Sequence, residues 1–129
     1  MADYTHLNLK DVEDQAPKFG MENLEFRMAR LPLELENSGL SYLRLAPNFR
    51  IPFGHHHKQQ EEIYVLVGGS ARLKLDDEIV DLKPWDAVRI HRETMRNFEA
   101  GPDGAEIIAF GAPNTGPGDG PMTDGWWTD

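Results

Sequence analysis

Residues 54–68 read Gly-His-His-His-Lys-Gln-Gln-Glu-Glu-Ile-Tyr-Val-Leu-Val-Gly, and this stretch is the most informative part of the chain about its chemistry. Side chains alternate between the two faces of an extended strand, so His55 and His57 project to the same face. Glu61 follows, just before the apolar run 63–67, which has the β-branched and aromatic residues of a buried strand. Two imidazoles and one carboxylate on one face form a ligand set for a divalent metal. We therefore predict a metal site built from His55, His57 and Glu61.

Short segments of strand character continue on both sides of this stretch. Turns are expected at residues 68–69 and 101–104, where glycines and a proline interrupt the pattern. Roughly eight or nine strands without a long helical pattern are the signature of an all-β sandwich or barrel. The segments are residues 24–29, 40–45, 50–57, 62–67, 71–75, 79–82, 87–90, 96–100 and 106–110.

The strand pattern covers only the middle of the chain. Residues 1–22 form an irregular lead-in, and residues 113–129 form a Gly- and Pro-rich tail. We predict one barrel domain over residues 23–112, since 129 residues fit a single domain and no internal repeat is visible. Trp126 and Trp127 in the tail are expected either to anchor it on the barrel wall or to cover a pocket as a lid.

The composition excludes several classes of partner. The chain has 13 basic and 22 acidic residues, a formal net charge of -9, which argues against binding to nucleic acid or to an anionic membrane surface. It has no cysteine, so a metal would have to be held by nitrogen and oxygen. No secretory signal is visible in residues 1–20, and the apolar run 63–67 is too short to span a bilayer. We expect a cytoplasmic protein that binds a small-molecule ligand.

The histidine stretch resembles the first conserved motif of the cupin family, Gly(X)5His-X-His(X)3-4Glu(X)6Gly. The match runs through His55, His57, Glu61 and Gly68, whereas Phe49 stands where the family has its leading glycine. The resemblance covers about residues 40–112. It implies a double-stranded β-helix, or jelly-roll, barrel with a central pocket, and it implies a homodimer.

The second cupin motif is recognisable but altered. Pro84 is present, and Trp85-Asp86 occupies a step that is usually Gly-Asp. Aligned without gaps, the family's fourth metal ligand, normally histidine, becomes Arg96. His91 falls where the family usually has proline, so we expect it at the surface or the barrel rim rather than at the metal.

Arg96 leaves two arrangements open, because arginine is always cationic and cannot bind a metal. In the first, His55, His57 and Glu61 hold a divalent metal (Fe, Mn, Zn or Ni), and Arg96 binds an acidic group of the substrate. In the second, Arg96 pairs with Glu61, no metal binds, and the pocket accepts a small anion.

These arrangements correspond to two functions. The first is a metal-dependent enzyme, dioxygenase- or isomerase-like, that acts on a small anionic or oxygen-rich molecule. The second is a non-catalytic binding protein for small anions. The cupin fold supports many chemistries, so the resemblance does not identify the reaction or a catalytic residue.

Overall fold

The computed structural model describes residues 1–114 and 119–128. Strands dominate, and the two helical segments are single 3₁₀ turns near the N-terminus, which confirms the predicted all-β class. In chain order the elements are η1 (Leu9–Asp11), η2 (Ala16–Phe19), β1 (Leu24–Met28), β2 (Gly39–Leu45), β3 (Phe53–His55), β4 (Glu61–Leu75), β5 (Glu78–Leu82), β6 (Ala87–Ile90), β7 (Arg96–Ala112) and β8 (Met122–Asp124).

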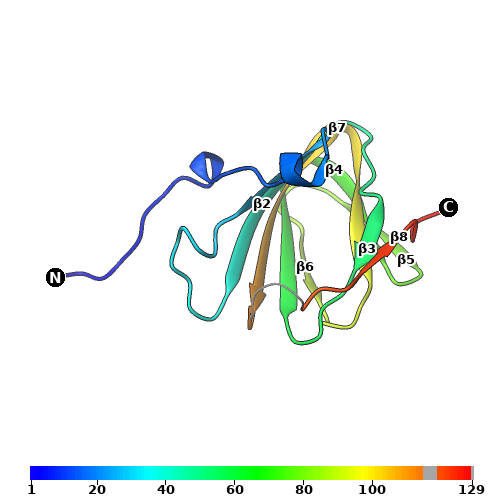
Figure 1. Cartoon of the computed structure of the whole chain (residues 1–129). Helices are drawn as coiled ribbons and strands as arrows, with labels where there is room; N and C mark the ends of the chain where they lie inside the picture. The colour runs from blue at the N-terminus through cyan, green and yellow to red at the C-terminus, as the bar shows by residue number, and fades with distance from the viewer. Residues whose placement is uncertain (115–118, 129) are drawn as a thin grey trace.

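The two long strands β4 and β7 pair antiparallel along most of their lengths and form the backbone of a curled sheet (Figure 1). At one end of this pair, β6 adds to β4, and β2 followed by β1 adds to β7. At the other end, β5 adds to β4, and β3 followed by β8 adds to β7. The result is a half-barrel, and the concave side of the sheet is the inside of this half-barrel. The jelly-roll connectivity implied by the family resemblance stays a prediction.

The turns expected at residues 68–69 and 101–104 lie inside the long strands. The register of β4 against β7 shifts between Leu66 and Gly68 and again between Gly69 and Ala71, so a pair of bulges bends both strands together. Gly69 has a φ of 72°, and a Cβ at this position would lie 2.0 Å from the carbonyl oxygen of Gly104. The glycines therefore produce the curl of the sheet instead of ending a strand.

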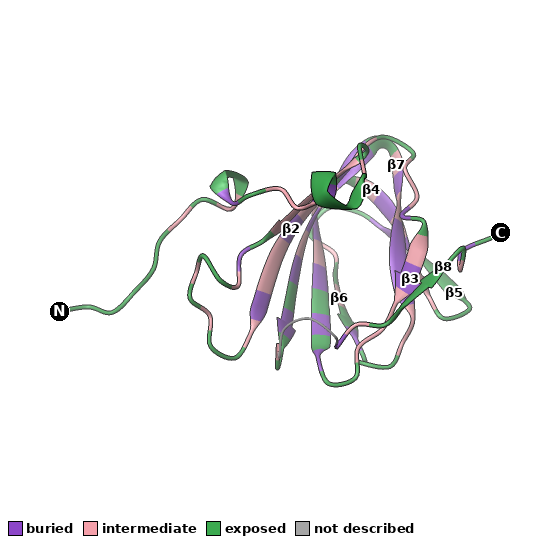
Figure 2. Ribbon diagram, viewed as in Figure 1, coloured by how far each residue is buried: buried purple, intermediate pink, exposed green. Residues whose placement is uncertain are grey.

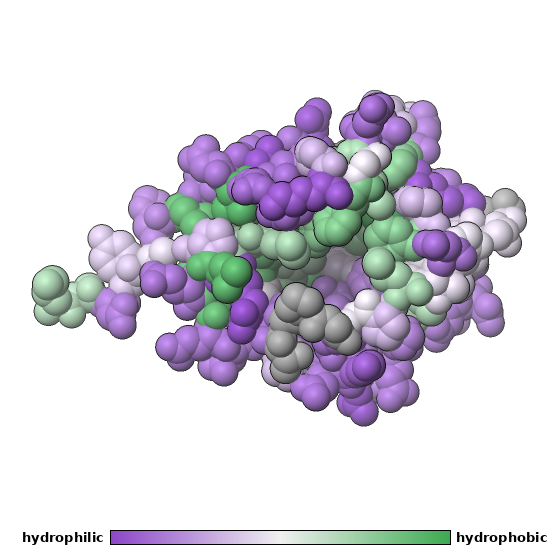
Figure 3. Space-filling model, viewed as in Figure 1, coloured by the Kyte–Doolittle hydropathy of each residue, from purple (hydrophilic) through white to green (hydrophobic). Residues whose placement is uncertain are grey.

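The concave side of the sheet holds the hydrophobic core. Along the first half of β4, Glu62, Tyr64 and Leu66 are buried, whereas Glu61 and Ile63 are exposed, as period-two alternation requires (Figure 2). Other residues from both halves of the sheet complete the core, including Leu45, Leu73, Ile90, Phe98 and Ile107. On one face of the molecule hydrophobic residues gather near a hollowed middle and hydrophilic residues surround them (Figure 3).

The N-terminal lead-in runs along the outside of β1, and its first residues extend away from the body of the molecule (Figure 1). Asp14 forms an isolated bridge with Arg27, and the guanidinium of Arg27 donates a hydrogen bond to the carbonyl oxygen of Val12. β1 begins at Leu24 and β7 ends at Ala112; the division into lead-in, barrel and tail stays a prediction.

The C-terminal tail is anchored on the sheet. Strand β8 pairs with β3, and the Trp127 side chain is buried with the guanidinium of Arg50 4.5 Å from its ring centre. Trp126 packs against Gly54, where a Cβ would lie 2.4 Å from the indole, and Lys74 stands 4.6 Å from its ring centre. Of the two roles considered for the tryptophans, this arrangement favours anchoring.

None of the helical segments in residues 1–114 and 119–128 is long and apolar enough to cross a membrane.

Candidate metal centre

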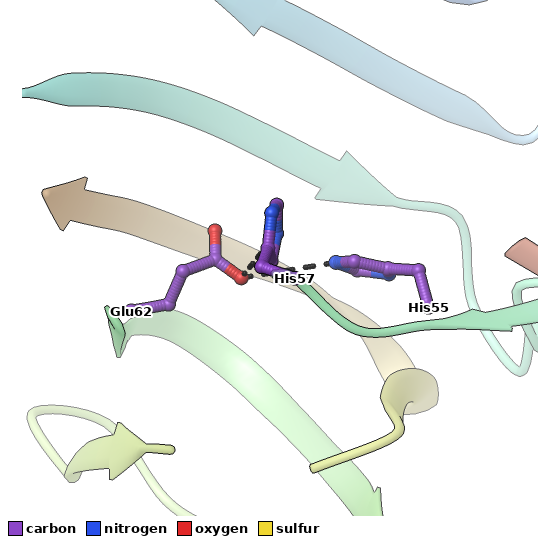
Figure 4. Close-up of side chains that lie close together, drawn as sticks. All are labelled: His55, His57 and Glu62. Carbon is purple, nitrogen blue, oxygen red and sulfur yellow. Dashed lines mark ion pairs between the residues drawn. The ribbon is translucent and has the colours of Figure 1, made fainter. Parts of the chain in front are cut away.

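Three strands bring the polar cluster together at one end of the concave face. His55 is the last residue of β3, His57 follows two positions later, and Glu62 lies near the start of β4. Arg96 begins β7 and is the ladder partner of His55. The close-up in Figure 4 shows both imidazoles directed at the carboxylate of Glu62.

The three side chains of His55, His57 and Glu62 converge closely. Each offers one ligand atom, and these atoms all lie within 4.8 Å of one another. Nε2 of His57 is 3.3 Å from Oε1 of Glu62, and Nε2 of His55 is 3.7 Å from the same oxygen. The two imidazole rings are nearly perpendicular, with centres 5.3 Å apart. The predicted convergence of His55 and His57 is therefore present in the structure.

The carboxylate that joins the histidines is Glu62, and the placement predicted for Glu61 was wrong. Glu61 points away from the concave face, is 60% exposed and lies 3.7 Å from Arg89 on the outer surface. The side chain of Glu62, by contrast, is 10% exposed. The reason is strand parity, because neighbouring residues of a regular strand face opposite sides.

The sequence held the signal that distinguishes the two glutamates. The cupin spacing accepts three or four residues between the second histidine and the carboxylate, so Glu61 and Glu62 both fit. Glu62 is followed by Gly69 after the same six residues that separate Glu61 from Gly68. Tyr64 belongs to the run 63–67 that was predicted to be a buried strand, and of the two glutamates only Glu62 shares its face. The alternation of side chains along the strand therefore favours the alignment with Glu62 over the one with Glu61.

Arg96 contacts Glu62 and is completely buried. Its Nη2 donates to Oε1 of Glu62 at 2.7 Å, and its Nη1 donates to the carbonyl oxygens of Thr94 at 2.7 Å and Arg92 at 3.3 Å. The ion pair that we considered between Arg96 and Glu61 thus forms with Glu62. A substrate-binding role for Arg96 stays a prediction, and it would require a ligand to reach a guanidinium whose terminal nitrogens already donate to the protein.

Two further residues fix the carboxylate of Glu62 and were not among the predicted site residues. The hydroxyl of Tyr64 donates to Oε1 at 2.9 Å, and the side-chain amide of Gln60 donates to Oε2 at 3.2 Å. Gly111 stands opposite Glu62 in the ladder and leaves room for this amide, since a Cβ there would lie 2.4 Å from Nε2 of Gln60. Nothing in the sequence pattern distinguishes Gln60 from a surface residue.

Burial and neighbouring charges set the protonation states of the cluster. Burial lowers the pKa of His55 below its ordinary value of 6.5, although Glu62 acts in the opposite direction. Burial acts to raise the pKa of Glu62, but the imidazoles of His55 and His57 beside its carboxylate and the positive charge of Arg96 outweigh burial and lower this pKa well below 4.5. A neutral imidazole and an ionised carboxylate are the forms that bind a metal.

The donor atoms of the cluster fit a divalent metal. Nε2 of His57 is buried and makes no hydrogen bond, and Nδ1 of His57 lies 3.1 Å from the carboxylate of Asp119. A buried polar atom without a partner is unfavourable, and a metal would supply that partner. Metal-binding histidines usually direct their second ring nitrogen to a carboxylate or carbonyl, as His57 does. The set of two nitrogens and one oxygen suits iron, manganese, zinc or nickel.

The remaining histidines lie away from the cluster. His91 is exposed, as expected, and its Nδ1 accepts a hydrogen bond from the backbone N–H of Glu93 at 3.2 Å. His6 is exposed in the lead-in, and His56 is partly exposed between the two histidines of the cluster. Among the residues that the structure describes, His55, His57 and Glu62 are the one group of three or more potential ligands placed closely enough to hold a metal ion.

Because the pKa of Glu62 is lowered in the folded protein, we expect the free energy of unfolding to decrease as the pH falls below 4.5. As the pH falls below 4.5, the unfolded chain takes up a proton at Glu62 before the folded protein does, so the free energy of unfolding decreases. The contribution is complete above pH 4.5 and declines toward the lowered folded-state pKa. We expect urea unfolding of the metal-free protein across this range to show a steeper decline for the wild type than for Glu62→Gln. Glu61→Gln should decline like the wild type, and equal slopes in all three would contradict the assignment.

Two hollows on the surface, both lined by described residues, carry no comparable cluster. An open depression of about 610 Å³ lies between the lead-in and the β1 and β2 edge and is lined by residues such as Asp14, Met21 and Arg44. A smaller one of about 280 Å³ lies beside Tyr42, whose hydroxyl donates to Glu106 at 2.6 Å. Neither hollow contains a residue of the histidine cluster. Because size alone does not indicate a binding function, the histidine cluster stays the candidate functional site.

Comparison with known proteins supports the fold through structure rather than sequence. No protein-family model matches the chain, and no curated protein does. A cupin protein from Bacteroides fragilis superposes with a TM-score of 0.72 at 22% identity, over 89% of this chain and 88% of that one. Oxalate decarboxylase from Bacillus subtilis gives a TM-score of 0.76 at 20% identity over 96% of this chain but only 33% of its own length.

A third similar structure is Pac13 from Streptomyces, which is described as a nucleoside dehydratase and was solved with uridine. It superposes with a TM-score of 0.72 at 12% identity over 98% of this chain and 94% of that one. Identities this low establish the fold and not the activity. The half-barrel, the histidine cluster at its end and these three superpositions together show that the chain has the β-barrel fold of the cupins.

Proposed function

We propose that this protein is a small cupin that holds a divalent metal through His55, His57 and Glu62 and acts as a metal-dependent enzyme. One observation carries the proposal. Three ligand atoms from two different strands and the loop between them lie within 4.8 Å of one another, and one of them, Nε2 of His57, is buried without a hydrogen bond. A buried polar nitrogen without a hydrogen bond is uncommon in a folded protein, and its position 3.3 Å from the carboxylate of Glu62 supports a role in binding.

The metal would supply a Lewis acid that polarises an oxygen of the substrate. Two histidines and one carboxylate leave coordination positions open, and this ligand set suits Fe(II), although manganese, zinc or nickel can occupy it. A dioxygenase- or isomerase-like reaction fits such a centre. In this arrangement the protein residues around the metal hold its ligands: Arg96, Tyr64 and Gln60 orient the carboxylate of Glu62.

The charges at the site support an anionic substrate. A dication and Arg96 together outweigh the negative charges of Glu62 and Asp119, so a bound anion would neutralise the remainder. Oxalate and uridine, which appear in the descriptions of two structures with this fold, are small and oxygen-rich. A small anionic or oxygen-rich molecule is the substrate class that these points favour. The homodimer and the cytoplasmic location expected from the sequence stay predictions.

One observation favours a second function. Nη2 of Arg96 is 2.7 Å from the same oxygen of Glu62 that faces both histidines, so its cation already neutralises the carboxylate that a metal would bind. If no metal displaces this interaction, the protein would be a non-catalytic cupin that binds a small anion beside the histidines.

Elemental analysis distinguishes the two functions. We expect protein purified without chelator and without nickel resin to contain close to one equivalent of iron, manganese, zinc or nickel. Protein stripped of metal should recover it when the four ions are offered separately, measured by the same analysis after gel filtration. Metal-free protein that takes up none of these ions, yet is stabilised against heat by a small carboxylate or phosphate, would support the binding protein instead.

A further inference from the structure

Asp119 lies in the C-terminal tail, but its side chain contacts the loop that connects His57 to Glu62. Its side chain is largely buried, with 8% of its surface exposed. Oδ1 accepts from the backbone N–H groups of Lys58 at 3.2 Å and Gln59 at 3.0 Å, and Oδ2 lies 3.3 Å from the N–H of Gln60. The backbone carbonyl of Asp119 accepts from Lys58 as well, at 3.0 Å. One carboxylate thus holds three consecutive amides.

The same carboxylate contacts His57. Oδ2 of Asp119 is 3.1 Å from Nδ1 of His57. An ionised carboxylate can only accept a hydrogen bond, so Nδ1 carries the proton. In the neutral ring the other nitrogen, Nε2, is then left with its lone pair, and it is this nitrogen that faces Glu62 at 3.3 Å.

The loop 57–60 also depends on its neighbours in the tail. His56 donates its N–H to the carbonyl oxygen of Pro121, and a Cβ at Gly120 would lie 3.3 Å from Cε1 of His57. The short residue at position 120 therefore lets the tail pass directly against the imidazole. Glu62 lies only two residues beyond the end of this loop, so the position of Glu62 relative to His57 depends on the conformation of the loop.

We propose that Asp119 is a positioning residue of the metal centre: it orients the ring of His57, selects the tautomer with a free Nε2 and fixes the loop that leads to Glu62. This inference rests on the proposed function for its consequence, which is tighter metal binding. It makes the C-terminal tail a part of the site rather than an appendage of the barrel. Carboxylates that hold metal-binding histidines in this way typically contribute 10- to 100-fold in affinity.

The test compares Asp119→Asn with Asp124→Asn, which removes the same charge from an exposed position of the same tail. In Asp119→Asn the amide oxygen can still accept from the N–H groups of Lys58 and Gln59, whereas the NH₂ group takes the place of Oδ2 beside Nδ1 of His57 and favours the proton on Nε2. We expect Kd for manganese or zinc, measured by titration calorimetry, to rise roughly 10- to 100-fold in Asp119→Asn. Asp124→Asn should bind like the wild type. Equal affinities of the two variants would overturn the inference.

A second measurement does not need the metal. Correlation of the His57 ring nitrogens with their protons by NMR, in metal-free protein, should show a proton on Nδ1 in the wild type and in Asp124→Asn. In Asp119→Asn this proton should move to Nε2. A wild-type ring without a proton on Nδ1 would refute the role of Asp119. If the wild type binds no metal but shows this proton and its loss in Asp119→Asn, the proposed metal function fails and the positioning of His57 by Asp119 stands.

Discussion

Glu62→Gln is expected to weaken the binding of a divalent metal by more than about 100-fold, because changes beyond the ligands themselves already cost 10- to 100-fold. The neutral amide replaces the one anionic ligand of the cluster, and it offers the metal only a weakly donating oxygen. Glu61→Gln is the matched control, because the adjacent glutamate faces the outer surface beside Arg89. We expect its metal affinity to equal that of the wild type.

The measurement is a competition titration of stripped protein with manganese or zinc. Circular dichroism of each variant must accompany it, since Glu62→Gln leaves the buried guanidinium of Arg96 without its anion. Glu62→Asp provides a second variant: it keeps the negative charge for Arg96 but shortens the side chain by one methylene, so the fold should persist while the metal affinity falls. Loss of affinity in Glu61→Gln but not in Glu62→Gln would contradict the assigned ligand set.

The contrast between Glu61 and Glu62 shows which features of the structure could be predicted from the sequence. The all-β class follows from the spacing of short apolar segments, and the shared face of His55 and His57 follows from local strand geometry. Both depend on residues close together in the chain. The choice of Glu62 over Glu61 depended on which glutamate shares a face with the aromatic residue of the predicted buried strand, Tyr64, and the alternation of side chains along that strand answers this question.

Long-range contacts could not be predicted in the same way. Asp119 contacts His57 although the two residues are 62 positions apart in the chain, and the composition of the tail indicated only a Gly- and Pro-rich segment. Gln60 supports Glu62 because Gly111 on the neighbouring strand leaves it space. Alignment with the cupin motif did place Arg96 at the cluster, but its contacts with Glu62 and two carbonyl groups depend on packing that no spacing rule describes.

The second large effect concerns Arg96 itself. Arg96→Met is expected to lower the free energy of unfolding of the metal-free protein by about 3–5 kcal/mol, the usual loss when one member of a buried ion pair is removed. The methionine fills much of the space of the arginine, but it leaves Glu62 ionised and buried without a cation. In a domain of this size the loss corresponds to a decrease in Tm of about 10–20 °C. Thermal unfolding measured by circular dichroism would detect it.

Arg89→Met is the matched control, because it removes the same side chain from an ion pair with the adjacent glutamate. That pair, Arg89 with Glu61, is well exposed and 3.7 Å apart, so we expect a change below about 1 kcal/mol. The double variant Arg96→Met/Glu62→Leu removes both buried charges and should recover most of the stability lost in Arg96→Met. If Arg96→Met and Arg89→Met unfold at the same temperature, the buried pair contributes little and Glu62 is held mainly by Tyr64 and Gln60.

The same variant separates the two proposed functions. Removal of Arg96 leaves the carboxylate of Glu62 and the two imidazoles facing one another with no competing cation, so a dication should bind more tightly and restore the missing positive charge. Added manganese or zinc is therefore expected to raise the Tm of Arg96→Met more than that of the wild type, in proportion to the logarithm of metal concentration over Kd. If metal stabilises neither protein, the convergence of His55, His57 and Glu62 supports the metal-free anion site, in which Arg96 supplies the only cation that Glu62 requires.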